Sequence, residues 1–550
     1  MFSNKHNKIV KNIIICIAPL IPIAILLLSN KLQYYIVDDI HMNIYARGGF
    51  EKGFTRDTLF VNPILARIWK VLFAFNDNVD WMALTYLALI FICTIILIVV
   101  LNKYLKIWQS IILAYLFEII ILGWFTFTVI AYITSLFGIV LFLIGWEREK
   151  NKILLIILGI LFVDMGFLLR KDAFISSLIL AVPYIVYSLR KRIGVNINKR
   201  TIIILLSTVL VICVVNIMFG QLVYNDTAIK KYKQWNDARS NVVDYHIPKY
   251  EDDKELYKKI GFSENDYLGM TYIGGYLADN NVYSYDNLET IVKNTPLNVR
   301  YNFNALSILK GMAKMEALWI FAIGWLLSLL MTSKRKIVVI QGIITAIMIV
   351  GLLFIDRCPE RVHVPIFLVS FIILLIIALQ YPNKISKFKK SYFVVGTTFL
   401  IGLCCLASCF QLYQTNKSIE DAERKYESLS KFAENNKDKL FIFNSCAAVT
   451  RKEKMKIYSK KERYDNYTSL FGYELYSPMY YNQAKRFRFK NKESLLMNIV
   501  ENDNTYYVDI ANNYSKYIVK YLEEHSGRTI VFNTIKKGKE YSIYKMSYGD

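Results

Sequence analysis

The sequence predicts an all-α, polytopic membrane protein that ends in a small α/β domain. Of its 550 residues, 55% are hydrophobic and only 20% are charged, whereas soluble proteins average about 45–50% apolar and about 25% charged residues. The apolar residues also cluster in blocks long enough to cross a bilayer, such as MALTYLALIFICTIILIVVL at 82–101. The tail from 411 to 550 contains no such block. This pattern excludes an ordinary soluble enzyme, a disordered chain and a nucleic-acid-binding domain.

The number of apolar blocks sets the expected number of spanning helices. A helix needs about 17–25 residues to cross a bilayer, and about eleven blocks have roughly that length. The helices are expected at 12–29, 82–101, 107–123, 127–145, 153–169, 173–189, 201–219, 315–332, 337–355, 364–380 and 392–410. The first block follows a basic lead, but it is long and no A-x-A-like site follows it. We therefore expect a retained helix and not a signal peptide.

The distribution of lysine and arginine between the loops predicts the orientation. With a cytoplasmic N-terminus, the inside loops are NKYLK, WEREKNK, LRKRIGVNINKR, TSKRK and NKISKFKK. Each is rich in lysine or arginine, as cytoplasmic loops are. The external loops are then the segments 30–80 and 220–314, the turns RKD and DRCPERVH, and the tail. We therefore expect a multi-pass cell-membrane protein with a cytoplasmic N-terminus and an extracytoplasmic C-terminus.

Two domains are expected. Residues 1–410 form a transmembrane catalytic domain with external loops 30–80 and 220–314, and residues 411–550 form an extracytoplasmic α/β domain. The loop 220–314 is too long for a plain connection, so we expect it to cover the external mouth as a lid or acceptor platform. In the tail, four strand patterns and two helix patterns are present. They are KLFIFN, TYYVDI, RTIVFN and YSIYKM, and SIEDAERKYESLSKFAENN and NNYSKYIVKYLEEH.

Two adjacent aspartates, Asp38 and Asp39, follow the first helix in the motif VDDIHMNIY. At the membrane surface, repulsion between the two carboxylates and the low dielectric raise one pKa, or both groups share a cation. A carboxylate with a raised pKa suits a general base that takes a proton from a hydroxyl. The pair is the candidate catalytic site, and a solvated pair of loop aspartates is the alternative.

Both short external turns carry positive charge, against the usual bias. Fixed arginines bind phosphate oxygens through forked, charge-assisted hydrogen bonds. These turns therefore predict a bound anion, and arginines that reach lipid headgroups are the alternative. The candidate donor-phosphate residues are Arg170, Lys171, Arg357 and Arg361, and their neighbours Asp172 and His363 are further candidates.

The remaining candidates lie in apolar blocks or in the long loop. Ionisable groups within a membrane are functional candidates by default, and this applies to Glu118 and Asp164. A structural bond between Asp164 and Arg170 is the alternative. The loop 220–314 adds candidate contacts, each of which could equally be structural. They are Asn236, Arg239, Asp244 and His246.

Several common signatures are absent. The sequence contains no Walker-type phosphate loop, no G-x-G-x-x-G, no Cys/His cluster with zinc spacing and no nucleophile elbow. Six of the eight cysteines lie in apolar blocks. Cys358 and Cys446 are expected to face solvent, either as a disulfide or as two unrelated thiols.

Together these features resemble the GT-C superfamily of membrane glycosyltransferases. The resemblance rests on VDDIHMNIY, on GWFTFTVIAYITS, and on the turns FLLRKDAFISS and DRCPERVHVP. It covers the membrane part of the chain. The region around NDARSNVVDY also resembles bacterial membrane proteins of this architecture that have no assigned substrate.

The resemblance implies an inverting transferase that moves a sugar from a polyprenyl-phosphate donor to an extracytoplasmic acceptor, such as an envelope glycan, a lipid or a protein. Asp38 or Asp39 would activate the acceptor hydroxyl, and Arg170, Arg357 and Arg361 would hold the lipid phosphate. An apolar groove between helices would hold the prenyl chain. No cofactor is certain, and help from a divalent cation stays open. The tail carries no signature of a known acceptor-binding module.

Two other functions stay open. An envelope polysaccharide polymerase or ligase would use Arg239 and His246 in the long loop in place of the aspartate pair. A non-enzymatic lipid or solute transporter would be expected to show broken helices near the bilayer midplane and related halves. Neither feature is evident in the sequence, although Pro19 and Pro22 are expected to kink the first helix.

Overall fold

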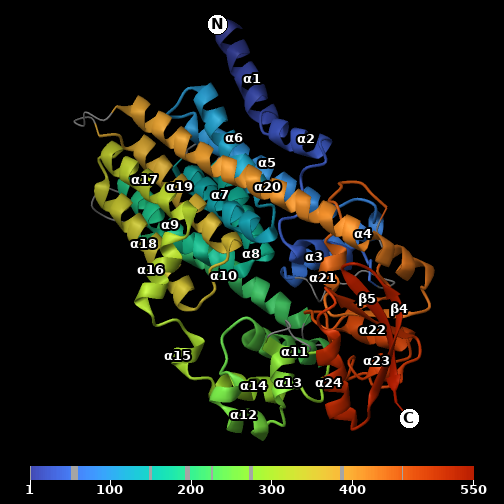
Figure 1. Ribbon diagram of the computed structural model, residues 1–550. Coiled ribbons are helices and arrows are strands. Elements are labelled where there is room, and N and C mark those ends of the chain that lie inside the picture. Colours follow the sequence, from blue (N-terminus) through green and yellow to red (C-terminus); the bar gives the residue numbers. More distant parts are fainter. Residues whose placement is uncertain are drawn as a thin grey trace.

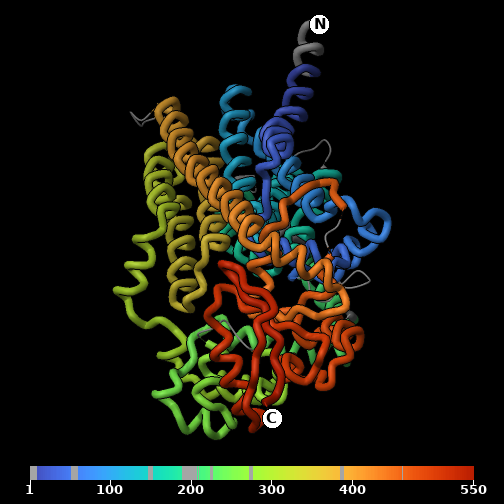
Figure 2. The backbone as a smooth tube through the Cα atoms, turned by 45° about the vertical axis from the view of Figure 1, so that its right-hand side comes forward, coloured from blue at the N-terminus to red at the C-terminus, as the bar shows by residue number. Residues whose placement is uncertain are grey.

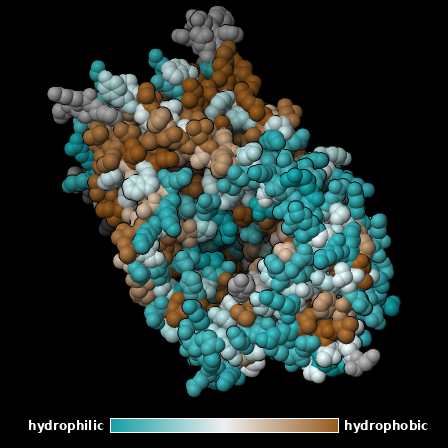
Figure 3. Space-filling view, viewed as in Figure 1, coloured by the Kyte–Doolittle hydropathy of each residue, from teal (hydrophilic) through white to brown (hydrophobic). Residues whose placement is uncertain are grey.

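The structure, a computed structural model, describes residues 2–50, 60–147, 152–192, 199–223, 227–271, 277–383, 389–460 and 463–549. Its helices form an apolar bundle, and a polar unit that contains the sheet lies at one end of this bundle (Figure 1). The N-terminus lies at the far end of the bundle and the C-terminus in the polar unit, as Figure 2 also shows. In Figure 3, a hydrophobic surface covers the bundle and a hydrophilic surface covers the polar unit.

Fourteen helices build the bundle and its margin. Three of them (α2, α3 and α4) are short, and α3 and α4 lie in the predicted segment 30–80. The bundle helices are α1 Phe2–Ile17, α2 Leu20–Leu28, α3 Val37–Ala46, α4 Pro63–Phe75, α5 Trp81–Leu101, α6 Ile107–Gly123, α7 Phe127–Glu147, α8 Lys152–Leu169, α9 Lys171–Arg192, α10 Lys199–Val223, α17 Glu316–Met331, α18 Arg335–Phe354, α19 Glu360–Gln380 and α20 Lys390–Asn435.

The described part of the chain holds seven helices that are long and apolar enough to cross a membrane, or up to nine if each of two bent helix pairs is one span. This is the character of a multi-pass membrane protein. Each of the eleven predicted ranges overlaps a helix, but the predicted count of about eleven spans is not confirmed. Two apolar helices, α6 and α8, are shorter than a full span, and the α16–α17 pair bends by 80°.

The described basic turns lie together at the end of the bundle opposite the polar unit. Thr332 pairs with Pro382 in an isolated β-bridge, and the Lys390 ammonium group donates to the Tyr104 carbonyl oxygen. Arg357, in contrast, contacts Asp244 in the polar unit. The predicted division of the loops into two sets at opposite ends therefore holds for these turns.

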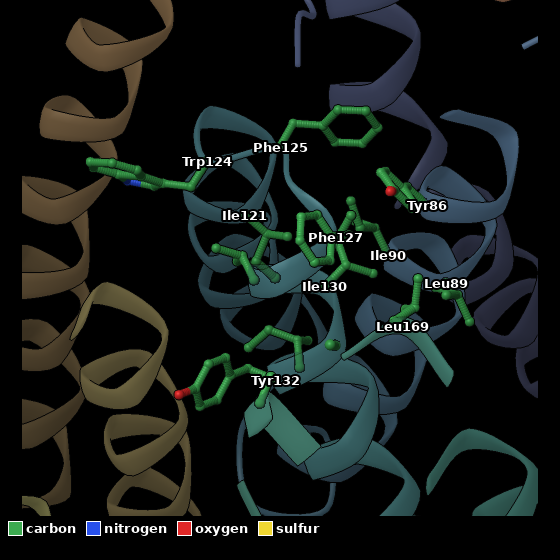
Figure 4. Close-up of a cluster of buried hydrophobic side chains, with 14 of the residues drawn as sticks. Tyr86, Leu89, Ile90, Ile121, Trp124, Phe125, Phe127, Ile130, Tyr132 and Leu169 are labelled. Carbon is green, nitrogen blue, oxygen red and sulfur yellow. The ribbon is translucent and has the colours of Figure 1, made fainter. Parts of the chain in front are cut away.

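Close packing of α7 on α8 forms the centre of the bundle. A β-carbon on Gly159 would lie 2.7 Å from the Phe142 backbone nitrogen and 2.8 Å from the Gly138 carbonyl oxygen, so only glycine fits there. Small residues bring membrane helices together in this way. The end of this core nearest the polar unit is aromatic: Figure 4 shows Tyr86 of α5 beside Phe125 and Phe127 at the start of α7.

The polar unit contains one five-stranded sheet with the strand order β2-β1-β3-β5-β4. β1 pairs in parallel with β2 and β3, and β5 pairs antiparallel with β3 and β4. The four predicted strand patterns are confirmed, and β2 was not predicted. The strands are β1 Leu440–Phe443, β2 Tyr467–Ser469, β3 Thr505–Ile510, β4 Ile530–Lys537 and β5 Tyr541–Tyr548, and the helices around them are α21 Cys446–Thr450, α22 Pro478–Arg486, α23 Asn498–Glu501 and α24 Ser515–Ser526.

The long segment before α17 belongs to the same unit. Trp235, Tyr283 and Leu288 share one hydrophobic core with Ile442 and Tyr507 of the sheet. Residues 235–271 and 277–288 are therefore part of the structure of this unit, because without them the sheet would lack part of its core. Its elements are α11 Thr227–Val243, η1 Tyr250–Asp252, α12 Lys254–Lys259, α13 Glu264–Thr271, α14 Tyr285–Asn294, α15 Leu297–Arg300 and α16 Ala305–Ala313.

One unbroken helix, α20, joins the bundle to the polar unit. It has 46 residues and is roughly 69 Å long at about 1.5 Å per residue. Its first part packs on α6 and α17, and its last part packs on α21. The predicted domain boundary at 411 therefore falls inside a helix, and the physical boundary lies near Asn435. Apolar residues fill the first half of α20 and charged residues the second half, which is why the composition changes at 411.

The eight cysteines are all free thiols, and Cys446 is buried at the start of α21. The disulfide that Cys358 and Cys446 could have formed is therefore absent, and the alternative of two unrelated thiols holds. Cys446 is covered because α21 packs against α3.

The α7–α8 contact predicts how a methyl group at Gly159 affects stability. We expect Gly159→Ala to lower the melting temperature in detergent, because overpacking a tight contact costs about 1–3 kcal/mol. Gly402→Ala on α20 is the matched control, since its β-carbon would meet no atom within 4 Å. Size-exclusion chromatography after heating measures both variants. An equal melting temperature for Gly159→Ala and the wild type would contradict the packing.

Candidate functional site

The helix α3 places the two predicted aspartates where the bundle meets the polar unit. Asp38 and Asp39 lie in its first turn, where a helix N-terminus favours negative charge. Almost every residue of α3 is buried. His41 bonds to Thr450 of α21 at 2.6 Å, so the helix is held by the polar unit as well as by the bundle.

Asp39 is fully buried. Its Oδ1 accepts hydrogen bonds from the Tyr86 hydroxyl and from the Phe127 backbone N–H, both at 3.1 Å. Its Oδ2 is buried and makes no hydrogen bond within the described structure. Burial raises the pKa of Asp39 to about 7, although the Thr126 hydroxyl and the Phe127 N–H oppose the rise. This carboxyl fixes α3 against α5 and α7 and can change its protonation near neutral pH.

Asp38 is only partly buried and faces several cations. Burial raises its pKa, whereas the charges of Arg361, Arg170 and Arg239 lower it, and Asp244 raises it again. These four residues come from three distant parts of the chain. Asp38 therefore has both the access to solvent and the charged surroundings that a reacting carboxylate needs.

Two predicted phosphate ligands converge beside Asp38. Arg170 lies in the turn between α8 and α9, donates from Nη1 to the Thr128 hydroxyl at 2.7 Å, and lies 5.2 Å from the centre of the Phe127 ring. Arg361 lies in the first turn of α19, and its Nε is buried without a hydrogen bond within the described structure. Burial lowers the pKa of Arg170, the charge of Asp172 opposes this, and the nearby charge of Arg361 lowers it further.

The other two predicted phosphate ligands do not point into this site. Arg357 forms an ion pair with Asp244 at 3.0 Å and also donates to the Asp244 carbonyl oxygen. Lys171 is exposed and its charge acts on Cys213 of α10. The structure therefore brings Arg170 and Arg361 to Asp38, whereas the contacts seen for Arg357 and Lys171 lie elsewhere. They share the turns with Arg170 and Arg361, but Arg357 is held by Asp244 and Lys171 is directed to the surface at the start of α9.

The three further candidates Asp164, Glu118 and Asp172 have different surroundings. Asp164 accepts from the Asn216 amide at 2.7 Å, so neither the predicted place near Arg170 nor the structural bond to it is seen. Glu118 is buried in α6, and neither of its carboxylate oxygens makes a hydrogen bond within the described structure. Asp172 is exposed, and its charge raises the pKa of Arg170.

From the long loop, Arg239 reaches the site and His246 does not. Arg239 is 9% exposed, and its charge acts on both Asp38 and Glu474. His246 is exposed and pairs with Asp356 at 2.7 Å. A joint role for these two side chains, as a polymerase or ligase would need, has no support in this geometry.

An apolar groove of about 710 Å³ opens next to the site, between α6, α17, α19 and α20. Its polar end carries Glu360 and His363, the neighbours of Arg361 along α19. Glu360 accepts from the Tyr35 hydroxyl at 2.9 Å, and His363 bonds to the Cys358 carbonyl oxygen at 3.1 Å. Inside, the groove is lined mainly by aromatic and aliphatic side chains.

A second, polar cavity of about 360 Å³ lies beside α3 and is lined by lysines, glutamates and Asp80. Asp80 accepts hydrogen bonds from Tyr34, Asn43 and the Ala83 N–H. Because these bonds satisfy its carboxylate, we regard Asp80 as structural. Among the described residues, no group of three or more His, Cys, Asp or Glu side chains could hold a metal ion.

Sequence reasoning missed the contribution of the segment FGYELY at 471–476 to this site. Tyr473 packs its ring 4.3 Å from that of Phe60 and 5.8 Å from that of Tyr45, and Glu474 is buried beside Arg239. The only signal in the sequence was a carboxylate among aromatic residues in a polar domain. Figure 3 shows that the molecule is hollowed on this face, where the hydrophobic band meets the hydrophilic part.

No family model, curated protein or solved structure matches this chain.

The raised pKa of Asp39 predicts a pH-dependent stability. An unfolded aspartate has a pKa of about 3.9, so the unfolded state releases its proton more readily and stability falls as the pH rises from about 4 to about 7. We expect the melting temperature of the wild type to fall more between pH 5 and pH 8 than that of Asp39→Asn. The corresponding loss in the free energy of unfolding is at most about 1.4 kcal/mol per pH unit. The exposed Asp503→Asn is the control, and equal slopes for all three proteins would contradict the assignment.

Proposed function

We propose that this chain is a membrane glycosyltransferase of the GT-C type, which moves a sugar from a polyprenyl-phosphate donor to an extracytoplasmic acceptor with inversion. The observation that carries the proposal is the meeting of Asp38 with Arg170 and Arg361 beside the mouth of a long apolar groove. A base, a phosphate-binding pair and a lipid-binding groove are the three parts that this reaction requires.

The donor end of the site matches a leaving lipid phosphate. As the bond between sugar and phosphate breaks, negative charge grows on the phosphate oxygens, and preorganised cations stabilise it most where water is scarce. Arg361 has a buried Nε without a partner within the described structure, and Arg170 is held by Thr128. Both can therefore meet phosphate oxygens with little reorganisation. The apolar groove beside Glu360 would take the prenyl chain.

The acceptor end needs a base on the opposite side of the sugar carbon. Asp38 fits this role better than Asp39, because Asp38 is partly exposed whereas Asp39 is enclosed by Tyr86 and Phe127. Asp38 would remove the acceptor proton as the hydroxyl oxygen attacks the anomeric carbon. Asp39 would position α3.

This proposal places the polar unit outside the cell. We expect a cysteine at Asp503, whose side chain is 98% exposed, to react in intact cells with a maleimide that cannot cross membranes. A cysteine at Ser333, in the basic turn at the other end of the bundle, should react only after the cells are opened. The parent for both variants is a cysteine-free protein. The reverse labelling pattern would place the site on the cytoplasmic side and remove the external acceptor.

Substitutions in the site test the chemistry. We expect Asp38→Asn to slow transfer from a polyprenyl-phosphate sugar about 10²–10⁴-fold, the usual contribution of a general base. Arg361→Lys should also slow it, because an ammonium group cannot reproduce the fork of a guanidinium group. Release of radiolabelled sugar from the donor measures both variants in purified, reconstituted protein.

The matched control for these variants is Arg335→Lys, an exposed arginine at the far end of the bundle. It should transfer sugar at the wild-type rate. Near-normal transfer by a folded Asp38→Asn variant would refute its role as base, and loss of transfer in His246→Ala would instead favour the polymerase or ligase. Protein-dependent lipid movement without sugar release would favour the transporter.

A further inference from the structure

The segment 471–474 forms a wall of the site opposite the bundle. The Tyr473 ring lies 4.3 Å from that of Phe60 and 5.8 Å from that of Tyr45 of α3. Its backbone carbonyl oxygen accepts from the Tyr232 hydroxyl of α11. The segment is therefore anchored to α3 and α11 at once, so its side chains hold fixed positions relative to Asp38.

Glu474 is a buried carboxylate that the fold leaves incompletely satisfied. It is 8% exposed, and its Oε2 makes no hydrogen bond within the described structure. Burial raises its pKa to about 7, although its own backbone N–H, the charge of Arg239 and the Tyr45 hydroxyl partly oppose the rise. A β-carbon on Gly472 would overlap this carboxylate, so the glycine makes the space that it occupies. An unpaired buried carboxylate oxygen is costly, which points to a role with a ligand.

Aromatic rings lie beside Arg239 and Tyr473, the neighbours of this carboxylate. The guanidinium carbon of Arg239 lies 5.9 Å from the centre of the Phe471 ring, and the Phe60 ring stacks on that of Phe127 at 6.4 Å. The Tyr473 hydroxyl is also buried and makes no hydrogen bond within the described structure. Ring faces offer apolar contact area and a carboxylate accepts hydrogen bonds from hydroxyls. A sugar ring, which has C–H groups on its faces and hydroxyls around its edge, matches both.

We propose that Glu474, Tyr473 and Arg239 form a carbohydrate subsite, in which Glu474 accepts hydrogen bonds from the hydroxyls of a glycan acceptor. The inference rests on the proposed function and deepens it, because it selects a glycan from the possible acceptors. The charge of Arg239 acts on both Asp38 and Glu474. A sugar bound at Glu474 thus lies next to the base that would activate one of its hydroxyls.

The test is binding of simple glycosides to the full chain in lipid nanodiscs, measured by saturation-transfer difference NMR. The probes are the methyl glycosides of glucose, galactose, mannose and N-acetylglucosamine. We expect at least one to give a saturable signal with the wild type. Glu474→Gln should raise its Kd about 10–100-fold, the loss expected for hydrogen bonds to a charged group. Glu255→Gln, an exposed glutamate on α12, should bind as wild type does.

A second variant covers the case in which Glu474→Gln fails to fold. Gly472→Ala would displace the carboxylate without removing it, and it should weaken the same glycoside in a protein whose melting temperature is monitored. Tyr473→Phe should weaken it less. No saturable binding to the wild type, or equal binding by wild type, Glu474→Gln and Gly472→Ala, would overturn the subsite.

The test of the subsite can fail or succeed independently of the test of the proposed transferase. Hydrolysis of the polyprenyl-phosphate sugar by water needs no acceptor, so it tests the donor site alone: Asp38→Asn and Arg361→Lys should reduce it, and the exposed Glu255→Gln should leave it within about twofold of wild type. Hydrolysis that depends on Asp38, without glycoside binding, would overturn the subsite and leave the transferase standing. Glycoside binding that depends on Glu474, without hydrolysis, would leave the subsite standing and remove the transferase.

Discussion

The burial of the Asp39 carboxylate is the constraint on which the site depends. Its Oδ1 accepts from Tyr86 on α5 and from the Phe127 N–H at the start of α7, so one side chain sets the position of α3 relative to two bundle helices. The direction of the Asp38 side chain follows from this arrangement, because adjacent residues of a helix point about 100° apart. When Asp39 points into the bundle, Asp38 points along its surface toward the arginines. An adjacent pair of identical residues thereby has two different surroundings, one enclosed and one accessible.

The sequence predicted both ends of α5 to α10 and of α17 to α19 to within four residues, but it missed the length of α20. Apolar blocks mark helices because every buried backbone group in a bilayer must be paired within its own helix, and all eleven ranges proved helical. Length depends on where neighbouring elements interrupt the chain. The helix α20, for example, continues to Asn435, 25 residues (435 − 410) past the predicted end of its apolar block, and it packs there on α21 of the polar unit. Such contacts are made between residues far apart in sequence, and periodicity does not reveal them.

The same distinction applies to the site. Arg170 and Arg361 were found because each follows an apolar block at the same end of the bundle, and that much is local information. Whether a neighbour such as Lys171 or Arg357 shares their direction depends on helix rotation and on partners such as Asp244. Glu474 could not be placed at all, since its position depends on how the sheet docks on α3 and α11. The predicted boundary at 411 lies inside α20 for a related reason: a change from apolar to charged residues does not end a helix.

The shared core of the polar unit has a consequence for biosynthesis. Residues such as Trp235 and Leu288 are synthesised well before the strands that cover them, and Ile442 of β1 follows Leu288 by 154 residues (442 − 288). At about 5–20 residues per second, this interval lasts roughly 8–30 s. During that time an apolar surface waits uncovered while six further helices (α15 to α20) are made. Arrest of translation between Leu288 and Ile442 would leave an aggregation-prone intermediate. The order of translation, and not only the final contacts, therefore affects whether this protein folds without aggregating.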